Sequence, residues 1–198
     1  MQPPSPAEIR SLHEKYAPGS DAFDLVFTHC EIVWSIAEKL IATAGRDLDA
    51  DLVRAGCLLH DIGVYRLIDE TGRVDEANYL RHGLLGHEIL AAEGFPEELC
   101  RFCSCHTGVG LTKHDVESQG LPLPVADYVA VTGEERLVMY ADKFHSKSNP
   151  PKFLSVDSYA RYIARFGGDK VSAFACLRAE FGEPDLTGLA AAHRHALV

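Results

Sequence analysis

Apolar residues recur every three or four positions between Phe23 and Ile41, and this spacing constrains the fold more than any other feature of the chain. It places the apolar side chains on one stripe of a long helix, which must pack against other elements. Gly45 follows the stripe and is the residue type that usually ends a helix. The sequence therefore predicts one long amphipathic helix in the first quarter of the chain.

Capping residues mark the other expected helices. Ser5-Pro6-Ala7-Glu8 and Thr132-Gly133-Glu134-Glu135 are capping boxes, Asp49 is a typical N-cap, and Gly63 stands where a helix could end in a left-handed turn. Residues 64–80 and 107–124 read as irregular, apart from a short helix starting at Lys113. Further helical patterns lie at about residues 81–93, 97–105, 156–166, 169–181 and 185–196.

No segment alternates convincingly between apolar and polar residues, and no Asn-Gly or Asp-Gly hairpin turn is present. We therefore expect an all-α, single-domain helical bundle. The 198 residues suffice for one buried core. We assign residues 1–153 to this core with its N-terminal helix. The remaining residues, 154–198, form a helical extension that packs on the core or makes a dimer contact.

The charge of the chain excludes several classes of partner. Its 19 Lys and Arg residues against 29 Asp and Glu residues give a net charge of −10, which disfavours a broad surface for nucleic acid or anionic membrane. No apolar run approaches the roughly 18 residues that span a bilayer, and residues 1–6 lack a signal-peptide pattern. The six cysteines read as reduced thiols. These features predict a cytoplasmic protein.

The ten histidines are the unusual part of the composition, and several of them fall at interior or helix-end positions. His60-Asp61 ends one predicted helix, where an imidazole and a carboxylate can approach the same cation. Asp142 interrupts an apolar helical run, where a buried carboxylate is costly unless it is paired or bound to metal. The residues that share such positions are His29, His60, Asp61, His82, His106 and Asp142.

This ordered set, centred on His60-Asp61-Ile62-Gly63 and including His82 with Gly86 four residues later, resembles the HD superfamily of metal-dependent phosphohydrolases over roughly residues 25–147. Four histidines and two aspartates resemble its dinuclear subgroup. The resemblance implies that Asp61 bridges two ions. It places His29, His60 and Asp142 on the first ion, and His82 and His106 on the second.

Within the superfamily, the pattern is most similar to bacterial hydrolases of dinucleoside polyphosphates. Cyclic-dinucleotide phosphodiesterases carry a Gly-Tyr-Pro motif, where this chain has Gly108-Val109-Gly110. The resemblance implies two divalent transition metal ions. Iron is the first choice, with Mn, Ni, Co, Zn or Mg as alternatives.

Other candidates compete with this set. His87 is an alternative to His82, but five helical residues rotate the ring by about 500°, so the two cannot face one ion. His145, one turn after Asp142, is either a neighbour of the site or an ordinary helix-end residue. The thiols of Cys100, Cys103 and Cys105, beside His106, suit a zinc knuckle, although thiols that only pack in the core are the commoner case. We assign no specific role to His13, His114, His193 or His195.

The sequence thus predicts hydrolysis of a phosphoester or phosphoanhydride bond by a hydroxide that bridges the two ions, with Asp61 as the catalytic residue. The substrate is a small phosphorylated molecule such as a nucleotide or dinucleoside polyphosphate, and Lys113, Lys143 and Lys147 are candidates for binding its phosphates. Two alternatives remain: a di-iron oxygenase on the same fold, and a non-catalytic nucleotide sensor. A homodimer is possible.

Overall fold

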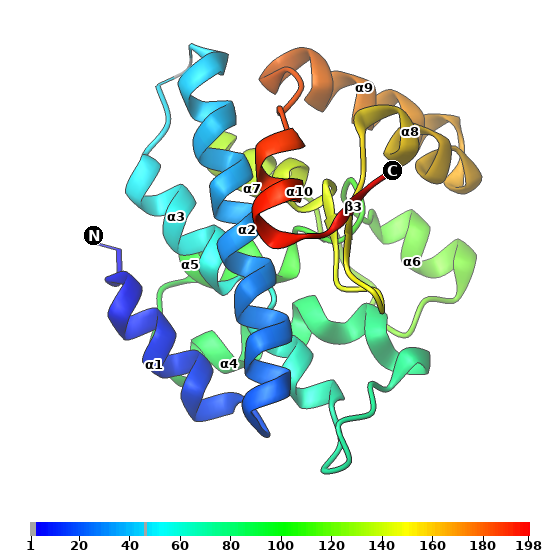
Figure 1. Ribbon diagram of the computed structural model, residues 1–198. Coiled ribbons are helices and arrows are strands. Elements are labelled where there is room, and N and C mark those ends of the chain that lie inside the picture. The colour runs from blue at the N-terminus through cyan, green and yellow to red at the C-terminus, as the bar shows by residue number, and fades with distance from the viewer. Residues whose placement is uncertain (1–2, 46) are drawn as a thin grey trace.

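The computed structural model describes residues 3–45 and 47–198, and these residues form a helical bundle as expected (Figure 1). The long helix α2 (Ser20–Ala44) crosses the bundle and contacts α1, α3, α7, α9 and the short strand β1. The helices besides α2 are α1 (Pro6–Tyr16), α3 (Ala50–Leu59), α4 (His82–Ala92), α5 (Glu97–Ser104), α6 (Lys113–Gln119), α7 (Gly133–Asp142), α8 (Val156–Ile163), α9 (Gly168–Phe181) and α10 (Thr187–His193).

The predicted caps explain where several helices begin. In the first capping box, the Ser5 hydroxyl accepts from the Glu8 amide at 3.3 Å while the Glu8 carboxylate accepts from the Ser5 amide at 2.8 Å. Thr132 and Glu135 form the same motif at the start of α7. The Asp49 carboxylate accepts from two amides of the first turn of α3. Local sequence therefore fixes the starts of α1, α3 and α7.

The apolar stripe of α2 forms the centre of the core. Val26, Cys30, Val33 and Ala37 are completely buried against neighbouring helices. His29 lies on the same buried side and is only 1% exposed. An imidazole placed there is held by a rigid, closely packed helix, which makes α2 the scaffold for one of the candidate ligands.

Gly63 does not end a helix in a left-handed turn, which corrects the sequence prediction. It lies inside the 3₁₀-helix η1 (Ile62–Leu67), and its backbone packs against the start of α4. A Cβ atom added to Gly63 would lie 2.0 Å from the His82 carbonyl oxygen and 2.2 Å from the Gly86 nitrogen. Gly63 is needed for a close approach of two backbones, and Gly86 faces the same contact.

The regions expected to lack regular structure contain short elements. A second 3₁₀-helix, η2 (Glu76–Arg81), leads directly into α4. The predicted helix at residues 156–166 is α8 followed by the 3₁₀-helix η3 (Ala164–Phe166). Three two-residue strands form a small sheet of order β1-β2-β3: β1 (His145–Ser146), β2 (Lys152–Phe153) and β3 (Ala196–Leu197). These short strands were not among the expected elements, although the fold is all-α in class as predicted.

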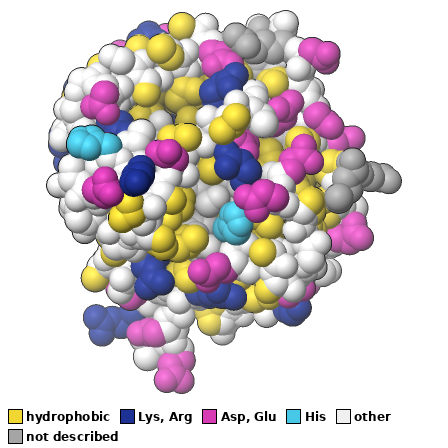
Figure 2. All heavy atoms as spheres, turned by 180° about the vertical axis from the view of Figure 1, so that it is seen from behind, with side chains coloured by type: hydrophobic (Ala, Val, Ile, Leu, Met, Phe, Trp, Pro, Cys, Tyr) yellow, Lys and Arg dark blue, Asp and Glu magenta, His cyan; other side chains and the backbone are white. Residues whose placement is uncertain are grey.

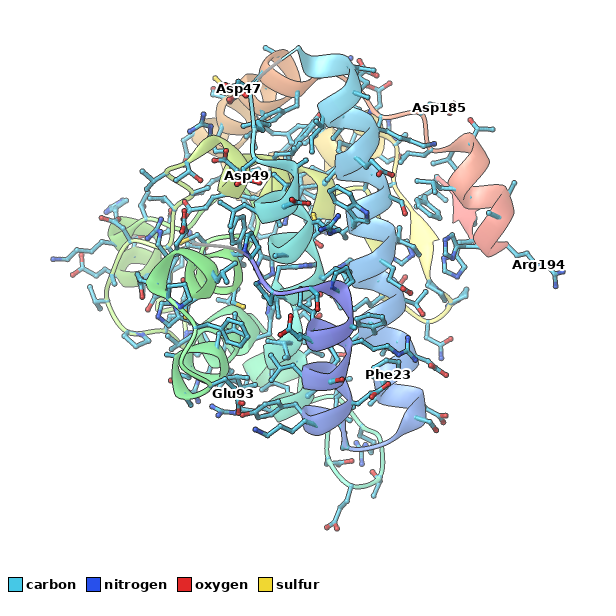
Figure 3. All side chains as sticks on the ribbon, turned by 90° about the vertical axis from the view of Figure 1, so that its left-hand side faces the viewer. Phe23, Asp47, Asp49, Glu93, Asp185 and Arg194 are labelled. Atoms are coloured by element: carbon cyan, nitrogen blue, oxygen red, sulfur yellow. The ribbon has the colours of Figure 1, made fainter. Side chains whose placement is uncertain are left out.

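The C-terminal helices pack on the rest of the bundle. Phe174 and Phe181 of α9 have their rings 5.7 and 5.9 Å from that of Tyr140 in α7. Near the start of α10, the Asp185 carbonyl accepts from Lys39 of α2 at 3.1 Å, and Figure 3 shows Asp185 beside the upper half of α2. The polypeptide then returns in β3 to pair in parallel with β2. The dimer contact suggested above stays a prediction.

Among the described residues, no helix combines the length and the apolar character needed to cross a membrane. On the described part of the face in Figure 2, acidic and basic side chains are interspersed rather than gathered in a continuous basic surface.

Candidate metal centre

The six predicted ligand residues converge from five parts of the bundle. His29 comes from the middle of α2, whereas the others lie at or near helix ends. His60 and Asp61 follow α3, His82 begins α4, His106 lies two residues beyond α5, and Asp142 is the last residue of α7. They form two groups whose ligand atoms lie within 4.8 Å of one another: His29, His60, Asp61 and Asp142, and then Asp61, His82 and His106.

In the first group, two carboxylates face two imidazoles. The Nε2 atom of His29 lies 3.2 Å from Asp61 Oδ2 and 3.0 Å from Asp142 Oδ1. The Nε2 atom of His60 lies 3.4 and 3.5 Å from the same two oxygens. Four donor atoms of the types that bind divalent transition metals thus surround one point.

The second group shares Asp61 through its other oxygen. Oδ1 of Asp61 lies 3.6 Å from His82 Nε2 and 3.5 Å from His106 Nε2. This oxygen is buried and has no hydrogen-bond partner within the described structure. A buried carboxylate oxygen without a partner is costly, and a bound cation would satisfy it. The donor set therefore fits two metal ions that share Asp61.

Backbone carbonyls orient three of the four imidazoles. The Nδ1 atoms of His60, His82 and His106 each donate to the carbonyl three residues earlier, at 2.7, 2.6 and 2.6 Å. A neutral imidazole that donates from Nδ1 keeps the lone pair on Nε2. Each of these rings, when neutral, therefore presents its Nε2 lone pair to the cluster.

The electrostatics of the cluster favour a cation. Burial alone would raise the pKa of Asp61, but Lys147 and the surrounding imidazoles more than offset it and hold that pKa well below its usual range. Burial lowers the pKa of His82 to about 3, so this ring is neutral. For His60, burial opposes the charged form, yet Asp61 raises the pKa well above its usual value. The carboxylates thus draw positive charge into the cluster.

A cavity of about 610 Å³ opens onto the centre. Asp61, His82, His106 and Asp142 contribute to its lining at the cluster. Among the lining residues that the sequence analysis did not single out are Lys152, Tyr79, Tyr159 and Tyr162. These residues come from η2, β2 and α8, so no local pattern in the sequence brings them together.

The three candidate lysines differ in position. Lys147 lines the cavity, and its ammonium contacts Asp61. Lys143 also borders the cavity, but its ammonium is buried and donates to the His106 carbonyl at 3.0 Å and to Asp142 Oδ2 at 2.7 Å. Lys143 is thus engaged in holding two candidate ligands. Lys113 is exposed at the start of α6 and is not part of the cavity lining, so the structure does not bring it to the centre.

Two other histidines lie close to the centre. His145 is buried, and its Nδ1 atom lies 2.9 Å from Nδ1 of His29. Its Nε2 atom lies 3.1 Å from Nδ1 of His195, a residue to which the sequence analysis gave no role. Burial lowers the pKa of His145 to about 2. The contact between His145 and His195 could not be found from sequence, because 50 residues separate them.

The remaining candidates have structural surroundings. His87 points away from the cluster to Ser104 and Glu97. Cys100, Cys103 and Cys105 are buried free thiols, and the groups of potential metal ligands among the described residues contain no cysteine. The sequence analysis assigned no role to His13, but the structure shows that this residue has a structural one. This residue is fully buried, and its ring links Tyr65 and the Leu58 carbonyl.

Sequence comparison identifies several relatives of this chain. The chain is 38% identical over 120 residues to the uncharacterized protein MJ0778 of Methanocaldococcus jannaschii, a match covering 59% of this chain and 64% of that protein. It is 35% identical over 142 residues to a tRNA (cytidine(56)-2'-O)-methyltransferase of Picrophilus torridus, covering 67% of this chain and 38% of the enzyme. The chain thus matches less than two thirds of the length of each relative.

Structural comparison shows the same fold in a phosphodiesterase domain. The HD domain of the phosphodiesterase PgpH from L. monocytogenes superposes with a TM-score of 0.55 at 16% identity, over 93% of this chain and 98% of that domain. The same domain in complex with cyclic-di-AMP gives a TM-score of 0.54 at 18% identity, over 95% and 98%.

The HD-domain family profile matches residues 26–147, which include all six candidate ligands. Because this match covers more than half of the chain, the chain belongs to the HD-domain family.

Proposed function

We propose that this protein uses two divalent metal ions to hydrolyse a phosphoester or phosphoanhydride bond of a nucleotide or dinucleoside polyphosphate. The observation that carries the proposal is the position of Asp61, whose two oxygens face two separate groups of imidazoles. A carboxylate in this position suits two cations, and paired cations are common in enzymes that cleave phosphate bonds.

The ligand assignment follows from the two groups. His29, His60, Asp61 and Asp142 would hold one ion, and Asp61, His82 and His106 the other. Bound there, divalent ions supply charge for a phosphoryl group and lower the pKa of water. Iron remains the first choice, with Mn, Ni, Co, Zn or Mg as alternatives, because imidazole and carboxylate donors accept several of these metals.

The cavity supports a phosphorylated substrate with an aromatic part. Lys147 and Lys152 provide positive charge close to the ligands, which suits phosphate oxygens. Tyr159 and Tyr162 of α8 line the same cavity, and aromatic rings can stack on a nucleobase. The PgpH domain, which has the same fold, was solved in complex with the nucleotide cyclic-di-AMP. We keep dinucleoside polyphosphates as the preferred substrate, because Gly108-Val109-Gly110 differs from the cyclic-dinucleotide motif.

A phosphate-release screen tests the proposal. The purified protein, loaded with each candidate metal in turn, is incubated with nucleoside mono-, di- and triphosphates, dinucleoside polyphosphates and cyclic dinucleotides, with and without oxygen. We expect metal-dependent product release that does not require oxygen and stops when a chelator removes the metal. Turnover that consumes oxygen would instead identify an oxygenase. Stoichiometric nucleotide binding without turnover, across all the metals, would identify a sensor.

Replacing Lys147 with methionine is expected to raise KM by about 10- to 100-fold, because a charge-assisted contact to phosphate contributes about 1.5–3 kcal/mol. The measurement is steady-state kinetics on the best substrate from the screen. Lys113→Met is the matched control, because Lys113 is exposed and lies outside the cavity lining. Equal KM values for both variants and the unaltered protein would show that Lys147 does not bind substrate.

A further inference from the structure

His29 differs from the other three imidazoles in the partner of its Nδ1 atom. His60, His82 and His106 each donate to a backbone carbonyl three residues earlier. His29 lies in the middle of α2, where backbone carbonyls accept from amides of the same helix. Its Nδ1 atom instead lies 2.9 Å from Nδ1 of His145. The orientation of this ring therefore depends on a side chain.

The contact continues to the last residues of the chain. Nε2 of His145 lies 3.1 Å from Nδ1 of His195. The ring planes are close to parallel, at 28° between His29 and His145 and 20° between His145 and His195, with centroid distances of 5.2 Å in both pairs. Phe153 packs its ring against His145 at 4.9 Å. Three imidazoles thus form a row from the candidate metal centre to the C-terminal segment.

The direction of the hydrogen bonds along this row follows from the chemistry of imidazole. A neutral ring has one N–H donor and one acceptor nitrogen. If His29 presents the Nε2 lone pair to an ion, its proton is on Nδ1 and is donated to His145. His145 then carries its own proton on Nε2 and donates it to Nδ1 of His195. In the opposite arrangement, the proton of His29 would be on Nε2 and would block the metal.

His195 supports the first arrangement when its Nδ1 atom accepts the proton of His145. Its position is fixed by the backbone, because its amide donates to the Ala190 carbonyl at 3.1 Å. The residues that follow are also held: β3 pairs with β2, and the Val198 amide donates to the Phe153 carbonyl at 3.1 Å. Figure 3 shows the neighbouring Arg194 pointing away from the bundle at the end of α10. The strand thus keeps His195 beside His145.

We propose that His145 and His195 are positioning residues that hold His29 in the tautomer required for metal binding, so that the C-terminal strand completes the metal centre. This proposal rests on the ligand set proposed above but not on the reaction. Partners in the outer shell of a metal ligand commonly change metal affinity by about 10- to 100-fold when they are removed.

The test compares three variants of the full chain by Zn²⁺ affinity, measured by competition with a chromophoric chelator. His195→Phe keeps a ring but removes the acceptor, and we expect it to weaken Zn²⁺ binding by about 10-fold. His195→Asn keeps an acceptor oxygen at a similar reach, and we expect its affinity to lie within about threefold of the unaltered protein. His114→Phe is the control, because His114 is exposed on α6 and lies outside the cavity lining, and its affinity should not change.

The unfolding temperature of each metal-free variant separates tautomer control from packing. Unchanged Zn²⁺ affinity in His195→Phe would overturn the proposal. The proposal would also be wrong if His195→Phe and His195→Asn lost the same Zn²⁺ affinity and the same thermal stability. Packing alone would then explain both losses. Since Zn²⁺ binding is measured without substrate, a failure to release phosphate would contradict the proposed reaction and leave this result in place.

Discussion

Replacing Asp61 with alanine is expected to abolish metal binding and phosphate release together. Asp61 is the only residue that belongs to both groups of candidate ligands among the described residues. Its loss removes one donor from each ion and a buried charge that compensates Lys147. We expect a fall in kcat/KM on the order of 1,000-fold, more than an outer-shell partner would cause. Elemental analysis of the purified variant measures the metal, and the phosphate assay measures the activity.

Glu70→Gln is a suitable control for the Asp61 variant, because Glu70 is an exposed acid outside the cavity lining. It should retain full metal content and activity. Circular dichroism must show that the Asp61→Ala protein keeps its helices. A folded Asp61→Ala variant with normal turnover would remove Asp61 from the mechanism and contradict the proposed dinuclear centre.

Gly63→Ala is expected to destabilise the protein by about 3 kcal/mol or more, the upper end of the usual cost of overpacking. The new methyl group would lie 2.0 Å from the His82 carbonyl oxygen and 2.2 Å from the Gly86 nitrogen. Both are backbone atoms, so a change of side-chain rotamer cannot relieve the clash. Because His82 belongs to the second ligand group, the same displacement should weaken metal binding. Chemical denaturation and Zn²⁺ titration measure the two effects.

Gly188→Ala provides the matched comparison. A Cβ atom added to Gly188 would meet no atom within 4 Å, and the residue lies in the helix α10. Alanine is favoured over glycine in a helix by about 0.5–1 kcal/mol, so this variant should be as stable as the unaltered protein or slightly more stable. Equal stability of the Gly63 and Gly188 variants would contradict the close approach of η1 and α4.

The helices could be predicted from sequence because their signals are local. The apolar stripe of α2 spans many turns, and the capping boxes at Ser5 and Thr132 need only four residues each. The gathering of the six candidate ligands was also predicted, since their order along the chain matched a family pattern and helix ends bring such residues together. Whether they bind metal is still to be tested.

Features that depend on contacts between distant segments could not be predicted. Strands of two residues carry no detectable alternation, so β1, β2 and β3 were missed. The left-handed turn expected at Gly63 was wrong, because the need for glycine there arises from the backbone of α4. The three lysine candidates were chosen because they are cationic and lie in or beside predicted loops. Only the fold distinguishes the exposed Lys113 from Lys147 beside Asp61.

Most of the candidate metal ligands lie at or near helix ends, and this placement affects whether the centre attracts cations or anions. The carboxyl ends of α3, α5 and α7 lead to His60, His106 and Asp142, whereas α4 begins at a ligand, His82. The carboxyl end of a helix carries a partial negative charge of about half a unit. Together with the carboxylates of Asp61 and Asp142, these dipoles favour a cation at the point where the candidate ligands meet. We therefore expect metal to bind before a phosphorylated substrate does.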